Sequence, residues 1–186
     1  MNMKVHWFGK TVSERCRYAR SEEFAKVFER DRPGLQRLAL LLTANSEAAE
    51  RCLRRAFREC IASSTISKEW VRIWSRRMII RNAVSLVLEP EDESFINTNE
   101  DADHGFVAFS QEVSPGAIAG SESILGLPEL DRLVFVICIL EHYSMYDCAL
   151  LLGKPLRDVN EARRRVGGQA GQVGALDDVS QRFSIH

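Results

Sequence analysis

The stretch SMYDCALLLGKPLRDVNEARRRV, at Ser144–Val166, predicts two short helices joined by a tight turn. Ser144 and Asp147, three residues later, form a capping box that marks a helix start. Gly153 ends that helix where a left-handed backbone costs little, and Pro155 begins the next helix. Apolar residues recur at helical spacing on both sides of the turn. The stretch therefore predicts a helix-turn-helix.

The second of these helices has an apolar face and a basic face. Its predicted buried side consists of four apolar residues: Leu156, Val159, Ala162 and Val166. Gly167-Gly168 predicts the end of the helix. Its outward side carries the residues expected to contact base edges: Arg157, Asn160, Glu161 and Arg164. Two further cations are expected on phosphates: Arg163 and Arg165. This arrangement places side chains in the major groove of DNA, although two core helices without a ligand have the same spacing.

Charge is segregated along the 186-residue chain, although the formal net charge is only −1. Residues 15–88 contain 16 Lys and Arg against 8 Asp and Glu, whereas residues 89–131 contain 11 acidic residues and no basic one. Residues 132–169 are mildly basic, with 6 basic and 4 acidic residues. Such segregation concerns partners rather than fold. A polyanion such as DNA fits the basic block.

The basic block predicts a helical domain over residues 21–88. Apolar residues recur at helical spacing from Phe24 to Leu42, and Pro33-Gly34 marks either a boundary between two helices or a kink. Asn45 then caps a further helix. The buried face of that helix is predicted to contain Ala49, Cys52, Leu53, Ala56, Phe57 and Cys60. Its opposite face is mainly basic, with Arg51, Arg54, Arg55 and Arg58.

The last helix of this block is predicted from Ser67, capped by the Ser67 hydroxyl, to Leu88. It has a basic edge formed by Lys68, Arg72, Arg76, Arg77 and Arg81. Arginines on a solvated helix face usually pair with carboxylates four residues away, and beyond Glu69 this helix has none. Binding of an anionic ligand is therefore favoured. Trp70 and Trp74 are available for base stacking or for the core, and for Trp70 the core is the better prediction.

The remaining segments complete a five-part organisation. An N-terminal extension (1–20) precedes the first domain, and an acidic flexible linker (89–122) follows it. The second helical domain spans 123–169, with a helix that opens at Leu127-Pro128-Glu129, and a tail (170–186) ends the chain. The fold class is all-α, with two small helical domains.

Other functional classes find little support. The longest apolar run, Leu133–Leu140, is too short to cross a membrane, and no signal peptide is recognisable, so a cytoplasmic protein is expected. The five cysteines include no C-x-x-C pair, and the four histidines are scattered, so no metal and no cofactor is expected. Cys148 near His142 and Asp147 suggests a thiol nucleophile, but helix phase turns Cys148 inward. An enzyme is therefore not expected.

The chain resembles the sigma-70 family of transcription initiation factors, in its small extracytoplasmic-function form. Leu127–Phe135 (LPELDRLVF) is similar to the opening of the family's region 4, and Tyr143–Gly153 (YSMYDCALLLG) is similar to its Ser-x-x-Glu-Ile-Ala-x-x-x-Gly helix. Asp158–Arg165 resembles its recognition helix. Region 2 is similar in layout over Ala48–Phe57 and Trp70–Arg81. The resemblance implies DNA and core RNA polymerase as partners, and an anti-sigma factor as a further partner.

The resemblance also assigns surfaces and shows departures. It implies that Lys68, Arg72, Trp74, Arg76, Arg77 and Arg81 contact the −10 element, and that the outward residues of the second helix read the −35 element. It places a polymerase-docking face at Glu50, Arg51, Arg54 and Arg55. There Arg51 stands for an acidic residue of the family and Arg54 for a Gln, which opposes docking on a basic target. The alternative is a DNA-binding regulator or adaptor on a degenerate sigma scaffold that no longer binds core polymerase.

Overall fold

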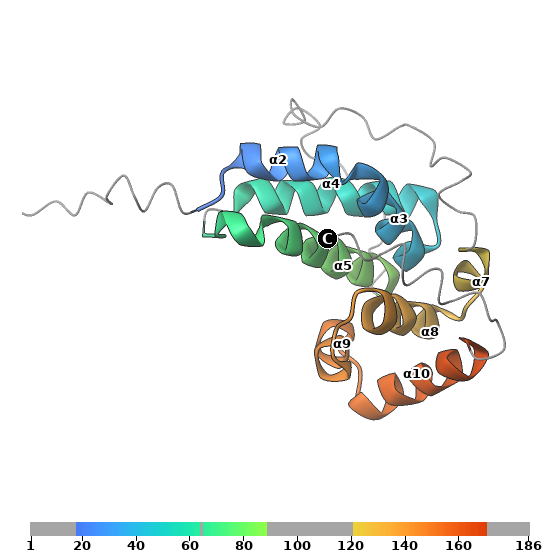
Figure 1. Ribbon diagram of the computed structural model, residues 1–186. Helices are drawn as coiled ribbons and strands as arrows, with labels where there is room; N and C mark the ends of the chain where they lie inside the picture. Colours follow the sequence, from blue (N-terminus) through green and yellow to red (C-terminus); the bar gives the residue numbers. More distant parts are fainter. Residues whose placement is uncertain (1–17, 64, 89–120, 171–186) are drawn as a thin grey trace, which may run out of the picture.

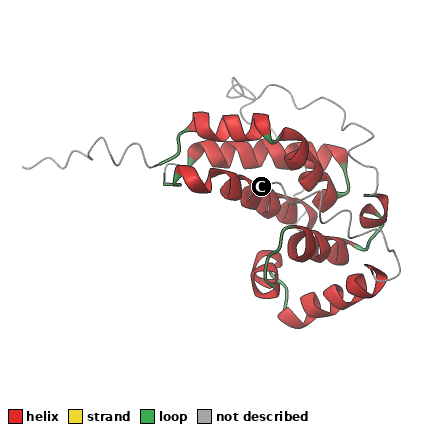
Figure 2. Ribbon diagram, in the orientation of Figure 1, coloured by secondary structure: helices red, strands yellow, loops and turns green. Residues whose placement is uncertain are grey.

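The computed structural model describes residues 18–63, 65–88 and 121–170, and these residues form helices joined by short turns (Figure 1). Within these ranges there is no strand, only one isolated bridge between Tyr18 and Ser67 (Figure 2). The predicted all-α class is confirmed for this part of the chain. The predicted N-terminal extension, acidic linker and C-terminal tail lie almost wholly outside the described residues. Among the described helices, none combines the length and apolarity needed to span a bilayer.

The first helical block, residues 18–88, packs four helices around one apolar core. They are α2 (Ser21–Arg30), α3 (Arg32–Thr43), α4 (Ser46–Ala62) and α5 (Val71–Leu88). Pro33 lies in the first turn of α3, where its missing N–H is no loss, so the chain forms two helices rather than one kinked helix. Asn45 caps α4 as predicted, accepting a 2.9 Å hydrogen bond from the Ala48 N–H. All six residues of the predicted apolar face of α4 are buried.

The second helical block, residues 121–170, contains the helix-turn-helix. It begins with α7 (Glu122–Leu125) and α8 (Glu129–Val134), which continues into a π-helical segment, η4 (Phe135–Leu140). Helices α9 (Met145–Leu152) and α10 (Leu156–Ala170) follow. Pro128 is the N-cap of α8, one position earlier than the first-turn place predicted for it. Every residue from Leu133, near the end of α8, to Cys138 of η4 is buried.

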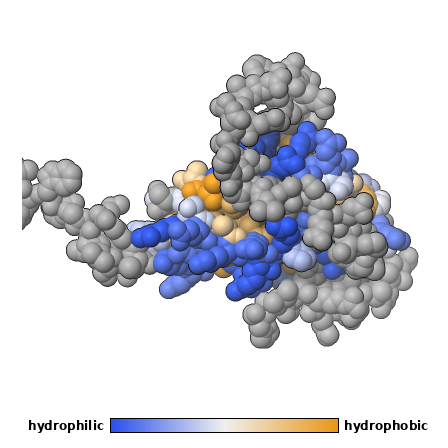
Figure 3. Space-filling view, turned by 90° about the horizontal axis from the view of Figure 1, so that it is seen from above, coloured by the Kyte–Doolittle hydropathy of each residue, from blue (hydrophilic) through white to orange (hydrophobic). Residues whose placement is uncertain are grey.

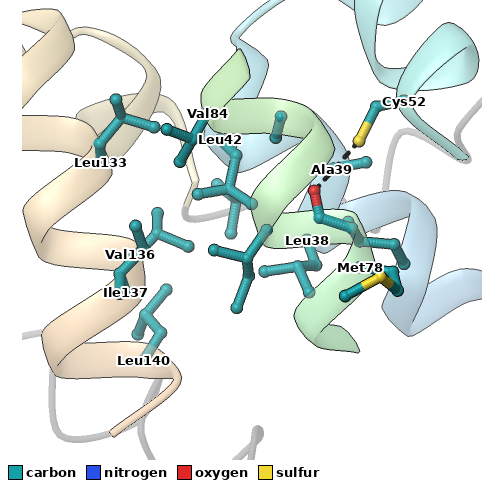
Figure 4. Packing of buried hydrophobic residues seen from close by; sticks show 14 of the residues in the cluster. Leu38, Ala39, Leu42, Cys52, Met78, Val84, Leu133, Val136, Ile137 and Leu140 are labelled. Atoms are coloured by element: carbon teal, nitrogen blue, oxygen red, sulfur yellow. Dashed lines mark hydrogen bonds between the residues drawn. The ribbon is translucent and has the colours of Figure 1, made fainter. Parts of the chain in front are cut away.

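The two blocks pack against each other (Figures 1 and 4). In Figure 4, Leu133 and Val136 of α8 and η4 face Val84 and Leu42 of α5 and α3. All four side chains belong to one continuous cluster of buried apolar residues. Polar contacts cross the same boundary: the Arg132 Nε donates to the Leu42 carbonyl at 3.4 Å, and an Arg37 Nη donates to the Ser121 hydroxyl at 3.2 Å. The described part of the chain is therefore a single packed body.

Two predicted helix ends differ from the structure. The Ser67 hydroxyl forms no capping hydrogen bond, and a short 3-10 turn, η1 (Lys68–Trp70), precedes α5. Gly167-Gly168 does not end α10, which continues to Ala170. The reason is that glycine is only weakly unfavourable within a helix, and buried Val166 anchors the turn before the glycine pair.

The left-handed turn at Gly153 allows a test of the helix-turn-helix geometry. Gly153 has φ +59°, and a Cβ added there would meet no atom within 4 Å. Gly153→Ala is therefore expected to lower the free energy of unfolding by about 1 kcal/mol through backbone strain alone. The measurement is urea denaturation followed by circular dichroism.

Gly167→Ala is the matched control, since a Cβ there also meets no atom within 4 Å but the residue is helical. It is expected to raise the free energy of unfolding by about 0.5–1 kcal/mol. Equal effects of the two substitutions would contradict the left-handed assignment.

Candidate nucleic-acid interface

Helix α9 is fixed at both ends by specific hydrogen bonds. The Ser144 hydroxyl accepts from the Asp147 N–H at 3.0 Å and donates to the Asp147 carboxylate at 2.6 Å, which starts α9 as predicted. Gly153 ends α9 in the left-handed conformation, and the Lys154 N–H donates a hydrogen bond to the Ala149 carbonyl at 3.1 Å. The helix-turn-helix predicted for Ser144–Val166 is thus present as a local structure.

Helix α10 packs through its apolar side against α8 and α9 of the second block. Val159 and Ala162 are fully buried, and Val166 is nearly so. Leu156, predicted to face inward with them, is instead 45% exposed. It lies at the first position of α10, where the helix has just left the turn. On α9, Cys148 and Ala149 are buried, which excludes Cys148 from acting as an exposed nucleophile.

The outer side of α10 presents mostly charged groups to solvent. Five of the six predicted contact residues are exposed: Arg157, Glu161, Arg163, Arg164 and Arg165. Asn160 is half-buried. The Arg157 side chain is 88% exposed, and its ion pair with the neighbouring Asp158, at 3.3 Å, is a weak surface contact. This surface is open to a ligand along its length.

Arg165 is not placed for a phosphate, contrary to the prediction. Its guanidinium points back to α8, where Nε and Nη2 donate to the Asp131 carboxylate at distances of 2.6–3.2 Å. The Asp131 side chain is only 7% exposed. A buried carboxylate needs such a partner, so Arg165 ties α10 to α8.

Most cations predicted for the −10 surface have carboxylate partners. Lys68 Nζ lies 3.1 Å from Glu23, and Arg72 Nε lies 3.0 Å from Asp31. Arg76 forms a bidentate ion pair with Glu141, in which Nε donates to Oε2 at 2.8 Å and Nη2 donates to Oε1. The helix contains no carboxylate beyond Glu69, as the sequence indicates, but Glu23, Asp31 and Glu141 from other segments supply partners.

Arg76 is the most enclosed of these cations. Its side chain is 26% exposed and that of Glu141 is 7% exposed. Burial disfavours the charged guanidinium, but the hydrogen bonds and negative charge of Glu141 outweigh this and raise the pKa of Arg76. Arg76 thus joins the first block to the second.

One face of η1 and α5 remains open, and it combines aromatic, apolar and basic groups. Its exposed residues follow helical spacing: Trp70, Ile73, Arg77 and Arg81. Trp70 is 57% exposed and Ile73 is 54% exposed. Neither Arg77 nor Arg81 forms an ion pair within the described part of the chain. We call these four residues the α5 stripe.

The two tryptophans have exchanged their predicted places. Trp70, expected in the core, is exposed because it lies in the 3-10 turn before the buried side of α5 begins at Val71. Trp74, placed on the −10 surface, is half-buried and packs against the core, with its indole N–H enclosed and without a hydrogen-bond partner. Of the two tryptophans that the structure describes, Trp70 is thus the exposed one.

The predicted polymerase-docking face lies on the outer side of α4. Arg51 and Arg54 are exposed there, and Arg54 forms an ion pair with Glu50 one turn earlier. Arg55 is half-buried. Hydrophilic side chains also cover much of the described surface in Figure 3, so polarity alone does not single out one binding face. The unpaired cations and the exposed indole of the α5 stripe are more selective criteria for a binding face.

Sequence reasoning missed the α5 stripe as a set and the partners of the predicted cations. The stripe has a sequence signal, since its members are spaced by three or four residues. Asp31, Asp131 and Glu141 have no such signal, because each reaches its arginine across a tertiary contact. Comparisons of the chain with protein-family models, with curated proteins and with solved structures each found no match.

Proposed function

We propose that this chain is a DNA-binding transcription initiation factor of the sigma type. In this proposal α10 reads duplex DNA at a −35-like element, and the α5 stripe binds bases of an opened strand. The observation that carries the proposal is the outer face of α10, where Arg157, Arg163 and Arg164 are exposed on the helix that follows the turn at Gly153. The sequence resemblance to sigma-70 regions 2 and 4 supports the same conclusion.

The face of α10 suits the major groove. Arginine donates two parallel hydrogen bonds to guanine, and half-buried Asn160 is the residue type that pairs with adenine. Glu161 accepts from the cytosine amino group. Arg163 is then the phosphate contact, since Arg165 is engaged with Asp131.

The α5 stripe suits a single strand rather than a duplex. An exposed indole stacks on any base, and cations about two and three turns further along the helix neutralise phosphates. Trp70 stands at one end of the stripe, while Arg77 and Arg81 continue it. A protein with both a duplex-reading helix and a stacking stripe has the two surfaces that promoter opening needs.

Loss of one exposed cation on α10 tests the duplex-binding face. Arg164→Ala is expected to weaken binding to a duplex selected from a random pool about tenfold, because one base or phosphate contact contributes about 1–3 kcal/mol. Fluorescence anisotropy at several salt concentrations measures both the affinity and its salt dependence.

Arg58→Ala is the control, since Arg58 is also an exposed arginine, on α4. It changes the net charge identically and is expected to alter affinity less than about twofold. If the two variants weakened binding equally, net charge rather than α10 would explain the interaction, and this proposal would fail.

A second candidate is a DNA-binding regulator that works without core polymerase. Exposed Arg51 favours it, because this arginine gives positive charge to the α4 face at a position where the sigma family has an acidic residue. Co-purification with core RNA polymerase separates the candidates. Binding by the wild-type chain supports the initiation factor. Binding only after Arg51→Asp with Arg54→Gln supports the regulator.

A further inference from the structure

Helix α9 is apolar on every side, yet only part of it is buried. Among its eight residues, Met145–Leu152, Asp147 alone is charged, and the others are Met, Tyr, Cys, Ala and Leu. A helix of this composition is normally buried all round. One side of α9 packs against η4, α10 and α5, and it contains buried Cys148, Ala149 and Leu152. The remaining side faces solvent, and in Figure 1 α9 lies at the outer edge of the second block.

The solvent side of α9 carries large apolar groups at helical spacing. Tyr146 is 66% exposed, and Leu150, one turn later, is 69% exposed. Leu156, the half-exposed first residue of α10, follows across the turn, in which the Gly153 N–H donates to the Leu150 carbonyl at 3.3 Å. We call Tyr146, Leu150 and Leu156 the α9 face.

The α9 face concentrates exposed apolar groups. Three of the seven large apolar side chains that are exposed in the described part of the chain belong to it. Single exposed apolar residues are common on soluble proteins, but a group of them marks a surface that binds another protein. The α9 face therefore calls for a partner, and the charges beside it indicate which one.

The charges at the two ends of α9 complement a second copy of the same helix. Asp147 lies three residues before Leu150, and Lys154 lies four residues after it. Both are exposed, and neither forms an ion pair within the residues that the structure describes. When two α9 helices pack antiparallel about a two-fold axis, the Asp147 end of each lies against the Lys154 end of the other. A strongly acidic or strongly basic partner would instead meet one like charge.

We propose that the α9 face is an interface between two copies of this chain, with the α9 helices antiparallel about a two-fold axis near Leu150. Leu150 packs against Leu150 of the second copy, with Tyr146 and Leu156 on either side. Asp147 of each copy pairs with Lys154 of the other. An interface centred on one helix per copy is small for a protein pair, so the dimer is reversible, with a dissociation constant in the micromolar range.

Sedimentation velocity of the full chain, from low micromolar to sub-millimolar concentration and with a dithiol reductant present, measures the association. The average mass is expected to rise from that of one chain toward that of two. The reductant excludes dimers made by disulfides between copies. A monomer at every concentration overturns the proposal, and the α9 face then belongs to a different protein or to a segment of this chain outside the described residues.

Leu150→Glu is expected to raise the dissociation constant at least tenfold. The two-fold axis places the substitution in the interface twice, and each copy puts a carboxylate into an apolar contact. Ile61→Glu is the matched control, since Ile61 is an exposed apolar residue on α4, and it is expected to change the constant less than about twofold. Circular dichroism checks that both variants fold, and Tyr146→Ser replaces Leu150→Glu if that variant does not. Equal effects on and off the α9 face overturn the proposal.

Exchange of the end charges tests the antiparallel arrangement. Asp147→Lys and Lys154→Asp are each expected to weaken association severalfold, because like charges then face each other at both ends of the interface. An equimolar mixture of the two variants is expected to associate as tightly as the wild type, since every pair in the mixed dimer is again of opposite charge. Single variants that associate as tightly as the wild type contradict the antiparallel arrangement and overturn the proposal.

The dimer and the proposed function can fail separately, because no DNA enters these measurements. A chain that dimerises through the α9 face but binds no DNA overturns the proposed function alone. A chain that binds DNA but stays monomeric overturns the dimer alone.

Discussion

Leu133→Ala is expected to lower the free energy of unfolding by about 3 kcal/mol, because it leaves a cavity in the apolar contact between the two helical blocks. Leu133 is completely buried, and it faces Val84 of α5 in Figure 4. The measurement is urea denaturation followed by tryptophan fluorescence. Trp74, half-buried in the first block, reports on a substitution made in the second.

This choice of reporter tests whether the blocks unfold together. If the packed body is one cooperative unit, the fluorescence midpoint and the circular dichroism midpoint fall together in Leu133→Ala. Leu150→Ala is the control, since Leu150 is 69% exposed on α9, and its effect is expected to stay below about 0.5 kcal/mol. An unchanged tryptophan transition in Leu133→Ala would mean that the blocks unfold independently.

Glu141→Ala is expected to lower the free energy of unfolding by about 2 kcal/mol. Removing one partner of a buried ion pair costs roughly 3–5 kcal/mol, and the 26% exposure of the Arg76 side chain lets water recover part of this. The remaining cost arises because Arg76 keeps its charge without a partner between the blocks. Thermal or urea denaturation measures the effect.

Two further variants test whether this loss of stability comes from the burial of the ion pair and not from its mere presence. Arg54→Ala breaks the pair with Glu50, in which the side chains are 45% and 31% exposed, and is expected to cost less than about 0.5 kcal/mol. Arg76→Met combined with Glu141→Leu removes both charges, and is expected to restore most of the loss. A double variant as unstable as Glu141→Ala would contradict this explanation.

The helical architecture was largely predictable because it depends on local chemistry. Asn45 and Ser144 cap helices, and Gly153 ends one, through bonds to backbone groups within three or four residues. The apolar face of α4 could be predicted for the same reason, since helical spacing decides which side chains share a face. Where local rules failed, as at Gly167, the local preference was weak and a tertiary contact outweighed it.

The candidate interface was less predictable, because exposure and pairing are properties of the packed body. Arg164 and Arg165 are exposed neighbours with the same chemistry, yet only Arg165 pairs with Asp131 of α8. Trp70 and Trp74 likewise differ only in their place relative to the start of α5. Glu161, one turn before Arg165, is 3.4 Å from its guanidinium, but Asp131, which receives the hydrogen bonds of Arg165, is 34 residues away in the sequence.

The sequence by itself determined the helices, their caps, the glycine turn and the basic character of α5 and α10, since these depend on residues close together in the chain. Only the tertiary structure decided which cations stay free, because Asp31, Asp131 and Glu141 reach their arginines through contacts between helices. Long-range packing excludes water from some charged groups and leaves others open, and this difference has no signature in local spacing.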